Sequence, residues 1–250
     1  MESKQKKESF NDWVRGFYDD KAKNYTRGDY EKFRWFASKK KKRQYYQTTR
    51  SLLFHFRNVN FKTCLDIGCG PGTWTFLLLK KYPSSKFTCL DISKEMLTQF
   101  KSRVNEKRID FVVSAFTDFK TKEKYDFIFA SRSIDYMENK SLVIKKMYDL
   151  LNSGGKGIIV TSPPHPTFIK IKKFLGKKLN KQHTQRISVK KMNKLLQEVG
   201  FKNIEFSPIL FTDSLPEFLN KFLFNLFYKK RWNLISKMFA SGYLVKFEKN

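Results

Sequence analysis

The stretch that decides the fold is Thr63-Cys64-Leu65-Asp66-Ile67-Gly68-Cys69-Gly70-Pro71-Gly72-Thr73. Its first five residues are mostly apolar, which is typical of a short buried strand. Glycines then recur at every second position, and residues 73–82 have the pattern of a helix that Pro83 ends. Glycine lets the backbone approach a ligand closely, so a strand that runs through a glycine turn into a helix predicts a ligand site at the carboxyl end of the strand.

Spacing and charge distinguish two classes of ligand for this turn. A dinucleotide fingerprint reads Gly-x-Gly-x-x-Gly, whereas here the spacing is Gly-x-Gly-x-Gly and Thr73 stands where the last glycine is expected. A pyrophosphate needs exposed amides and no nearby anion, yet Asp66 lies two residues before the first glycine. A cationic sulfonium cofactor that carries an ammonium group tolerates this carboxylate. The stretch therefore favours a sulfonium methyl donor over a dinucleotide.

A second acidic residue, Asp91, ends the next predicted strand, 86–91. An acidic residue at that position can accept hydrogen bonds from both ribose hydroxyls of an adenosine. A lone Asp at a strand end is more often a turn former or a helix cap. The glycine turn one strand earlier makes ribose binding the stronger interpretation.

The rest of the chain alternates between strand and helix patterns. We expect a mainly parallel sheet with helices on both faces, which is the doubly wound α/β class. A helix is predicted at 44–58, before the first strand. The predicted strands are 63–67, 86–91, 109–114, 125–130, 157–162, 203–206 and 243–248, and the helices between them are 73–82, 93–105, 141–151 and 188–199.

The motif Asp-x-Gly-x-Gly-x-Gly at 66–72, with Leu-Asp-Ile-Ser-Lys-Glu-Met-Leu at 90–97, resembles the class I S-adenosylmethionine-dependent methyltransferases. The subgroup it is most similar to includes ubiquinone and menaquinone biosynthetic enzymes (methyltransferase type 11). The likeness covers roughly residues 60–205. It implies a Rossmann-like, seven-stranded, mostly parallel sheet with an antiparallel last strand, and S-adenosyl-L-methionine as cofactor with no metal. It also implies an N-terminal helical lid and a C-terminal helical insertion.

The resemblance assigns roles by position along the motifs. One departure matters: the segment 114–116 lacks the Asp or Asn that the family usually carries near 115. The segment 17–25 resembles the family's lid, and Tyr25 is our candidate for the aromatic residue that covers the cofactor. The expected cofactor-binding residues are Asp66, Gly68, Cys69 and Gly70 at the methionine end, Asp91 at the ribose, Ile92, Met96, Ala115 and Phe116 at the adenine, and Ser131 where donor and acceptor meet.

Methyl transfer needs orientation and a dry pocket, and a base only where the acceptor must lose a proton. His165, which follows Pro163-Pro164, and His183, which precedes the helix 188–199, are the histidine candidates for a base; Asp135 and Tyr136 are further candidates. His55 lies in a predicted apolar helix and is expected to be structural. Residues 130–133 read Ala-Ser-Arg-Ser and lack the Asn/Asp-Pro-Pro-Tyr motif, which disfavours methylation of adenine or glutamine nitrogen.

The net charge of +28 favours an anionic partner. Lys and Arg outnumber Asp and Glu by 15 to 7 in residues 1–50 and by 10 to 1 in residues 163–200. We divide the chain into a basic, aromatic helical lid at 1–58 and a methyltransferase domain at 59–250, with cover insertions at 163–187 and 209–240. The second insertion has apolar residues three and four apart before a basic-aromatic cluster, a pattern that suits a membrane-surface helix, a cover over an apolar acceptor or an ordinary core helix.

Three functions remain open from the sequence. The first is an enzyme that methylates an oxygen or carbon of a small, lipid-like or lipid-linked acceptor, with an anionic membrane surface as a candidate partner. The second, less favoured, is an RNA methyltransferase that uses the basic flanks, and the third is a non-catalytic cofactor-binding scaffold subunit. The start of the chain lacks the apolar region of a secretory signal, and three cysteines do not suit a disulfide framework. We therefore expect reduced thiols and a cytoplasmic protein that is either free or associated with a membrane.

Overall fold

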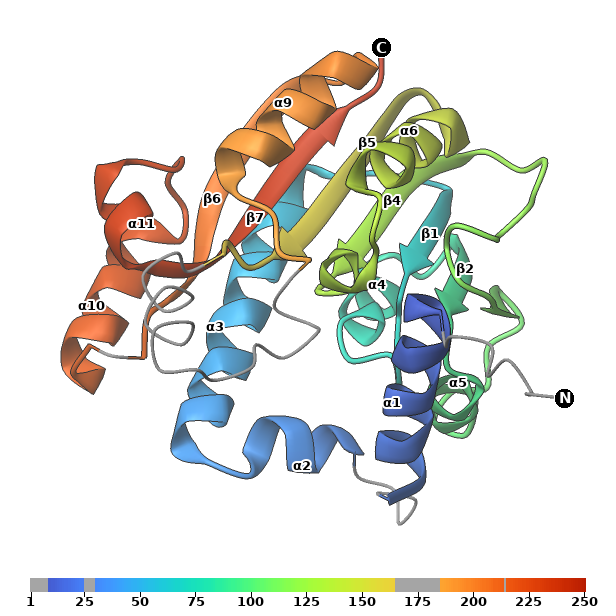
Figure 1. Cartoon of the computed structure of the whole chain (residues 1–250), viewed down its shortest axis with the longest axis horizontal. Helices are drawn as coiled ribbons and strands as arrows, with labels where there is room; N and C mark the ends of the chain where they lie inside the picture. Colours follow the sequence, from blue (N-terminus) through green and yellow to red (C-terminus); the bar gives the residue numbers. More distant parts are fainter. Residues whose placement is uncertain (1–8, 25–29, 165–184, 214) are drawn as a thin grey trace, which may run out of the picture.

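A computed structural model describes residues 9–24, 30–164, 185–213 and 215–250. Within these residues, seven strands form one sheet in the order β3-β2-β1-β4-β5-β7-β6 (Figure 1). The first five strands pair in parallel, whereas β7 pairs antiparallel with both β5 and β6. This arrangement confirms the predicted fold class. The strands are β1 (Thr63–Ile67), β2 (Lys86–Asp91), β3 (Ile109–Val113), β4 (Tyr125–Ser131), β5 (Leu151–Thr161), β6 (Lys202–Phe211) and β7 (Ala240–Glu248).

Helices cover both faces of the sheet (Figure 1). Side-chain caps define several helix starts: Ser93 accepts a hydrogen bond from the Met96 amide, and Ser188 does the same for Lys191. The described α-helices are α1 (Phe10–Asn24), α2 (Tyr30–Phe36), α3 (Lys39–His55), α4 (Thr75–Lys81), α5 (Lys94–Lys101), α6 (Lys140–Leu150), α9 (Val189–Val199), α10 (Glu217–Phe227) and α11 (Leu234–Phe239), and 3-10 turns span Phe56–Asn58 and Ile134–Tyr136.

Alternate residues of the central strands enter two different cores. In β4, Phe127 and Phe129 pack with residues of α3, α4 and α5, whereas Ile128 and Ala130 pack with residues of α6 and α9. This is the period of two that a strand imposes when both faces of the sheet are covered. The chain therefore builds the doubly wound arrangement from a run of apolar residues.

The strand order reverses between β1 and β4, which are neighbours although β2 and β3 come between them in sequence. In an open parallel sheet, the loops that leave the two strands on either side of such a point diverge and leave a crevice at the carboxyl ends. The glycine turn after β1 and the segment after β4 border this crevice.

Two strands begin or end elsewhere than predicted. Local turn propensity placed 152–155 in a loop, yet β5 already begins at Leu151, which pairs with Tyr125. The Gly154 amide donates to the carbonyl of Lys249, and the Lys249 amide donates to the carbonyl of Gly155. Likewise β6 runs to Phe211 because β7 offers partners along that length. Pairing within the sheet overrides the local signal in both places.

The predicted lid at 1–58 is divided by the structure. Leu52 and Phe56, from α3 and the turn after it, are fully buried in the core on one face of the sheet, so α3 belongs to the main domain. Trp35 of α2 joins the same core, and we call α1 and α2 together the lid.

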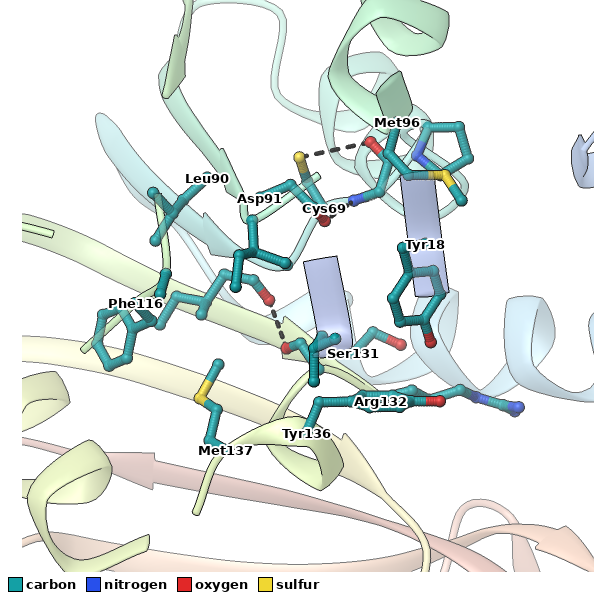
Figure 2. A pocket seen from close by; sticks show the side chains of 18 of the residues that line it. Tyr18, Cys69, Leu90, Asp91, Met96, Phe116, Ser131, Arg132, Tyr136 and Met137 are labelled. Carbon is teal, nitrogen blue, oxygen red and sulfur yellow. Dashed lines mark hydrogen bonds between the residues drawn. The ribbon is translucent and has the colours of Figure 1, made fainter. Parts of the chain in front are cut away.

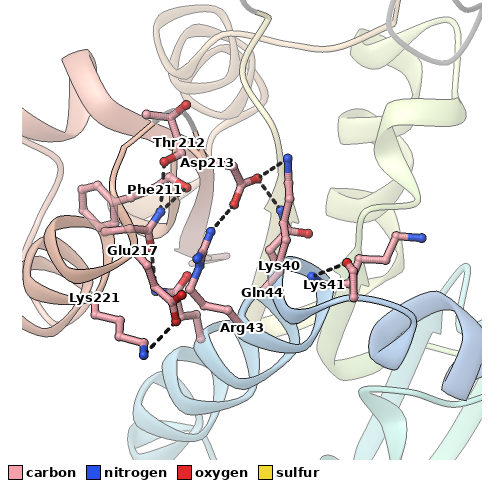
Figure 3. Close-up of polar contacts among 12 residues, drawn as sticks. Lys40, Lys41, Arg43, Gln44, Phe211, Thr212, Asp213, Glu217 and Lys221 are labelled. Atoms are coloured by element: carbon pink, nitrogen blue, oxygen red, sulfur yellow. Dashed lines mark hydrogen bonds and ion pairs between the residues drawn. The ribbon is translucent and has the colours of Figure 1, made fainter.

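The C-terminal insertion packs beside α3 (Figure 3). Asp213 accepts a hydrogen bond from Arg43 at 2.6 Å and one from Gln44 at 2.7 Å, and it lies 3.0 Å from the Lys40 ammonium. The buried Gln47 amide donates to Asn220 of α10 at 3.0 Å. These contacts fix α10 to α3.

Candidate functional site

The glycine turn after β1 is held by β2. The amides of Gly68 and Cys69 both donate to the Leu90 carbonyl, at 2.7 and 3.1 Å. Gly68 and Gly70 have φ of +71° and +56°, a region that favours glycine. A Cβ on Gly68 would lie 2.3 Å from the Cβ of Ser133, whereas a Cβ on Gly70 would meet nothing within 4 Å. Gly68 is therefore needed for packing, and Gly70 leaves open space above the turn.

Asp91 connects the turn to the end of β2. One carboxylate oxygen accepts the Gly70 amide at 2.8 Å and the other accepts the Ser93 amide at 2.9 Å. Burial raises the pKa of Asp91 to about 6, although these two hydrogen bonds act in the opposite direction. The carboxylate is ionised at neutral pH and is fixed at the edge of a cavity.

A cavity opens at the carboxyl ends of β1, β2, β3 and β4 (Figure 2). Its walls are the glycine turn, the end of β2, the segment after β3, the segment after β4, and the lid helices α1 and α2. Of the residues expected to bind the cofactor, those that line this cavity are Gly68, Cys69, Gly70, Asp91, Ile92, Met96, Ala115, Phe116 and Ser131.

Asp66 is the one expected cofactor residue that does not line the cavity. Its buried carboxylate accepts a hydrogen bond from the Thr75 hydroxyl of α4 at 2.6 Å. Burial raises the pKa of Asp66 to about 7. The residue thus connects β1 to the start of α4, beneath the turn.

The lid reaches the cavity through Tyr18 and Tyr30, which pack with Ala22 and Met96. Sequence reasoning missed Tyr18 and chose Tyr25, which lies outside the described residues. A signal for Tyr18 was present, because Val14, Tyr18 and Ala22 recur every four residues and so share one face of α1.

The lid also supplies a polar group near the segment expected at the adenine edge. Asn11 of α1 lines the cavity, and its amide donates to the Thr117 hydroxyl at 3.5 Å. Thr117 follows Ala115 and Phe116, where the sequence lacks the family's Asp or Asn. An amide from the lid therefore stands close to the place of the missing side chain.

The sequence did not predict that three further residues line the cavity together: Arg34 of α2, and Arg132 and Tyr136 after β4. Tyr136 was named only as a candidate base, and its ring contacts that of Tyr18 edge to face at 5.3 Å (Figure 2). Both arginines were read only as part of the overall basic charge, because no spacing rule brings α2 beside the end of β4.

The other candidate bases fall into two groups. His165 and His183 lie outside the described residues. Asp135 is buried and accepts a hydrogen bond from Thr161, and it does not line the cavity. His55 is buried in α3, where burial lowers its pKa to about 4, as suits the structural role expected for it. Across the described ranges, no three His, Cys, Asp or Glu side chains are grouped so that they could hold a metal ion.

The three cysteines, Cys64, Cys69 and Cys89, are buried and free. Burial raises the pKa of the Cys69 thiol well above its usual range, so it faces the cavity as a small apolar group. In the part of the chain that the structure describes, no helix is long and apolar enough to span a membrane.

Comparison with known proteins agrees with this fold. Sheet order and the site at the switch point define the class I methyltransferase fold, and the structure of the N-methyltransferase NodS from Bradyrhizobium japonicum matches with a TM-score of 0.63. That match covers 94% of this chain and 98% of NodS at 13% identity. The family described as "Methyltransferase domain" matches residues 64–155. The chain thus has the class I methyltransferase fold, and its residues 64–155 match a methyltransferase domain.

Two curated relatives extend the comparison. A malonyl-[acyl-carrier protein] O-methyltransferase of Ilyobacter polytropus is 29% identical over 113 residues, which are 45% of this chain and 42% of the relative. A trans-aconitate 2-methyltransferase of Enterobacter sp. is 35% identical over 91 residues, 36% of this chain and 35% of the relative. The matched region spans less than half of each relative.

Proposed function

We propose that this protein transfers the methyl group of S-adenosylmethionine to an oxygen or carbon of a small acceptor bound in the described cavity. The observation that carries the proposal is the convergence of the Gly68–Gly72 turn and the fixed Asp91 carboxylate on one cavity closed by α1 and α2. When bound, the cofactor supplies a methyl group activated by a positively charged sulfur.

The residues present suit that cofactor. Gly70 leaves space for a ligand to approach its backbone, and the Asp91 oxygens retain lone pairs for ribose hydroxyls. The buried Ser131 hydroxyl lines the cavity and has no hydrogen-bond partner among the described residues, so it can bond a ligand. The lid rings of Tyr18 and Tyr30 exclude water from the same place.

The names of the relatives support an acceptor of this kind. One relative is an O-methyltransferase for malonyl-[acyl-carrier protein], and the other is named for trans-aconitate. Both names indicate small acceptors, one of them attached to a carrier. They support oxygen as the atom methylated, and a lipid-like or lipid-linked acceptor remains part of our proposal.

Calorimetric titration with S-adenosylhomocysteine tests the cofactor site. Asp91→Asn should weaken binding by about tenfold or more, because a charged hydrogen bond contributes about 1.5–3 kcal/mol. Asp110→Asn is the matched control, since Asp110 is exposed on the neighbouring strand β3 and the charge change is the same. Binding to the wild type should also weaken below about pH 6, where Asp91 takes up a proton. A wild-type protein that binds no S-adenosylhomocysteine would refute the proposal.

Labelled methyl transfer into cell extract tests the acceptor class. We expect label in the small-molecule or lipid fraction, identified by mass spectrometry, and no loss of label after nuclease treatment. Label that disappears with nuclease would favour the RNA methyltransferase alternative instead. No transfer by a protein that binds the cofactor would favour the scaffold alternative.

We further propose that α10 and α11 bind an anionic membrane surface. Phe218 and Phe222 of α10 are 75% and 59% exposed, and Leu226 continues the same face at a spacing of four. On α11, Leu234 and Met238 are 71% and 66% exposed. Exposed apolar residues in such a group mark an interaction surface.

The charge beside this surface favours anionic lipid as the occupant. The connection between the two helices carries Lys229, Lys230 and Arg231, all exposed, and Lys221 and Lys237 lie on the helices themselves. Buried apolar area together with basic side chains is what binds an interfacial helix to anionic lipid. The opposite face of α10 is already occupied by its contacts with α3 and β6.

Sedimentation with vesicles tests this surface. The wild type should bind phosphatidylglycerol vesicles more than phosphatidylcholine vesicles, and the double variant Phe218→Ser, Phe222→Ser should bind much less. Leu142→Ser is the matched control, because Leu142 is 62% exposed on α6. Equal binding by the two variants, or concentration-dependent dimers lost only in the double variant, would contradict membrane docking.

A further inference from the structure

Two arginines of the cavity stand apart from the rest of its charged lining. Among the described residues that line it, Asp91 is the one acidic side chain, and Arg34 and Arg132 are the basic ones. Neither guanidinium has a carboxylate within 4 Å in the described part of the chain. Their hydrogen-bond partners are neutral: Arg34 donates to the Tyr30 hydroxyl at 2.6 Å, and Arg132 donates to the Thr48 hydroxyl at 3.2 Å.

The two guanidiniums share an aromatic neighbour. Each stands 5.1 Å from the ring centre of Trp35, the buried indole of α2. The indole N–H of Trp35 is itself buried, with no hydrogen-bond partner in the part of the chain that the structure describes. Burial and the nearby Arg34 lower the pKa of Arg132 to about 10, which leaves it charged at neutral pH. Two positive charges and an unused donor therefore meet at this wall of the cavity.

The backbone at Arg132 is unusual for a non-glycine residue. Its φ is +62°, and its amide donates to the Val160 carbonyl at 2.7 Å, which holds the residue in this conformation. Non-glycine residues in the left-handed region cost free energy and are concentrated at active sites and ligand contacts. Here the conformation places Arg132 beside Ser131 at the end of β4, on the wall that borders the cofactor (Figure 2).

A charge count separates the tasks of the two arginines. The proposed cofactor brings one carboxylate, which can neutralise one guanidinium. We assign it to Arg34, which lines the cavity from the lid helix α2 and donates to Tyr30 of the same helix. Arg132 instead donates to Thr48 of α3, and the carboxylate that acts on it electrostatically, Asp135, makes no ion pair with it within 4 Å in the described part of the chain. A partly buried cation without a direct ion pair is stabilised by an anionic ligand.

On the basis of the proposed function, we infer that the methyl acceptor carries an anionic oxygen group, a carboxylate or a phosphate, and that Arg132 binds it beside Trp35. The guanidinium fork suits either group because both present two oxygens to parallel N–H donors. Ser131 precedes Arg132 directly and Tyr136 follows it four residues later. Both line the same cavity and lie close enough to contact the remainder of the acceptor. Arg132 is then a specificity residue that orients the acceptor against the methyl group.

Thermal unfolding of the complex with S-adenosylhomocysteine tests this inference, with trans-aconitate as the carboxylate probe and inorganic phosphate as the phosphate probe. Sodium chloride at equal ionic strength is the salt control, since a protein of net charge +28 gains stability from any salt. At least one probe should raise the melting temperature of the wild type more than sodium chloride does. Arg132→Gln should abolish this additional rise and weaken binding of that probe by about tenfold or more in calorimetry.

Two variants complete the experiment. Arg57→Gln removes the same charge from an exposed position in the 3-10 turn after α3, and should behave as the wild type. Arg132→Gln should keep its affinity for S-adenosylhomocysteine within about threefold, since about 0.6 kcal/mol corresponds to that ratio.

The inference is wrong if neither probe stabilises the wild-type complex, if Arg132→Gln responds as Arg57→Gln does, or if Arg132→Gln loses the cofactor rather than the anion. Failure of the wild type to bind S-adenosylhomocysteine is a different result, which refutes the proposed function itself.

Discussion

Gly68 and Gly70 lie in one turn and both have positive φ, yet their surroundings differ. At Gly70→Ala the new methyl group enters open space, so the cost to folding is about 1–2 kcal/mol for the left-handed backbone. The same methyl group occupies the space above the turn, and we expect S-adenosylhomocysteine affinity to fall at least tenfold in calorimetry. Gly68→Ala, whose methyl group would collide with Ser133, should lower the melting temperature much further. Equal losses of stability in the two variants would contradict this distinction.

Asp66 offers a prediction about pH. Its pKa is raised from 3.8 to about 7, so the folded protein binds a proton between these values that the unfolded chain has lost. The free energy of unfolding contributed by Asp66 therefore falls as the pH rises from about 4 to 7. Asp66→Asn keeps an acceptor for Thr75 and removes the charge, so its stability relative to the wild type should increase over this range, by up to about 4 kcal/mol.

Denaturant unfolding at pH 4.5 and pH 8 measures this difference. Asp110→Asn, which alters an exposed carboxylate, is the control for general effects of charge. A constant difference between Asp66→Asn and the wild type at the two pH values would show that Asp66 is ionised in the fold at both.

At the scale of elements, α1 is attached to the sheet domain through the start of α5. Asp19 accepts a hydrogen bond from the Ser93 hydroxyl at 2.5 Å and lies at the positive end of that helix, 3.4 Å from the Glu95 amide. We expect Asp19→Ala to accelerate amide hydrogen exchange in residues 10–24 and to weaken S-adenosylhomocysteine binding, because Tyr18 depends on the same docking. Asp12→Ala is the matched control on the exposed side of α1, where Asp12 bonds Ser9 and Arg15. Unchanged exchange in Asp19→Ala would mean that apolar packing alone holds the helix.

The elements that could be predicted from the sequence are those fixed by nearby residues. Ser93 and Ser188 cap their helices as side chains that bond the backbone three residues on, and such local signals are readable without a fold. The start of β5 was not predictable in this way, because pairing with Tyr125 and with Lys249 decides it.

The candidate site likewise has one part that could be predicted from nearby residues and one part that could not. The cofactor wall was predictable because Gly68, Gly70 and Asp91 follow consecutive strands and carry a motif. The wall that forms where α2 meets the end of β4 could not be predicted, because Arg34 and Arg132 are 98 residues apart in a chain with many basic residues. Tyr18 was partly predictable, because helical spacing shows which face of α1 it shares but not which part of the molecule that face covers.

For the whole molecule, the dominant electrostatic fact is an excess of 51 Lys and Arg over 23 Asp and Glu. Such a charge repels itself in the compact state, and salt weakens the repulsion as the Debye length falls from about 30 Å at 0.01 M to about 3 Å at 1 M. We therefore expect the melting temperature to rise with sodium chloride. Removing single lysines should stabilise the fold most at low salt.

The gain in stability from removing a lysine should depend on where that lysine lies in a helix. Lys42 is exposed in the first turn of α3, where a positive charge opposes the helix dipole, and Lys81 is exposed in the last turn of α4, where it complements the dipole. Lys42→Glu and Lys81→Glu change the net charge equally, so Lys42→Glu should be the more stable of the two by about 1 kcal/mol at low ionic strength. Calorimetric melting at 0.01 M and 1 M salt measures both effects, because screening should remove most of the difference between the variants. If Lys81→Glu gained as much as Lys42→Glu at low salt, net charge alone would govern the stability of this protein.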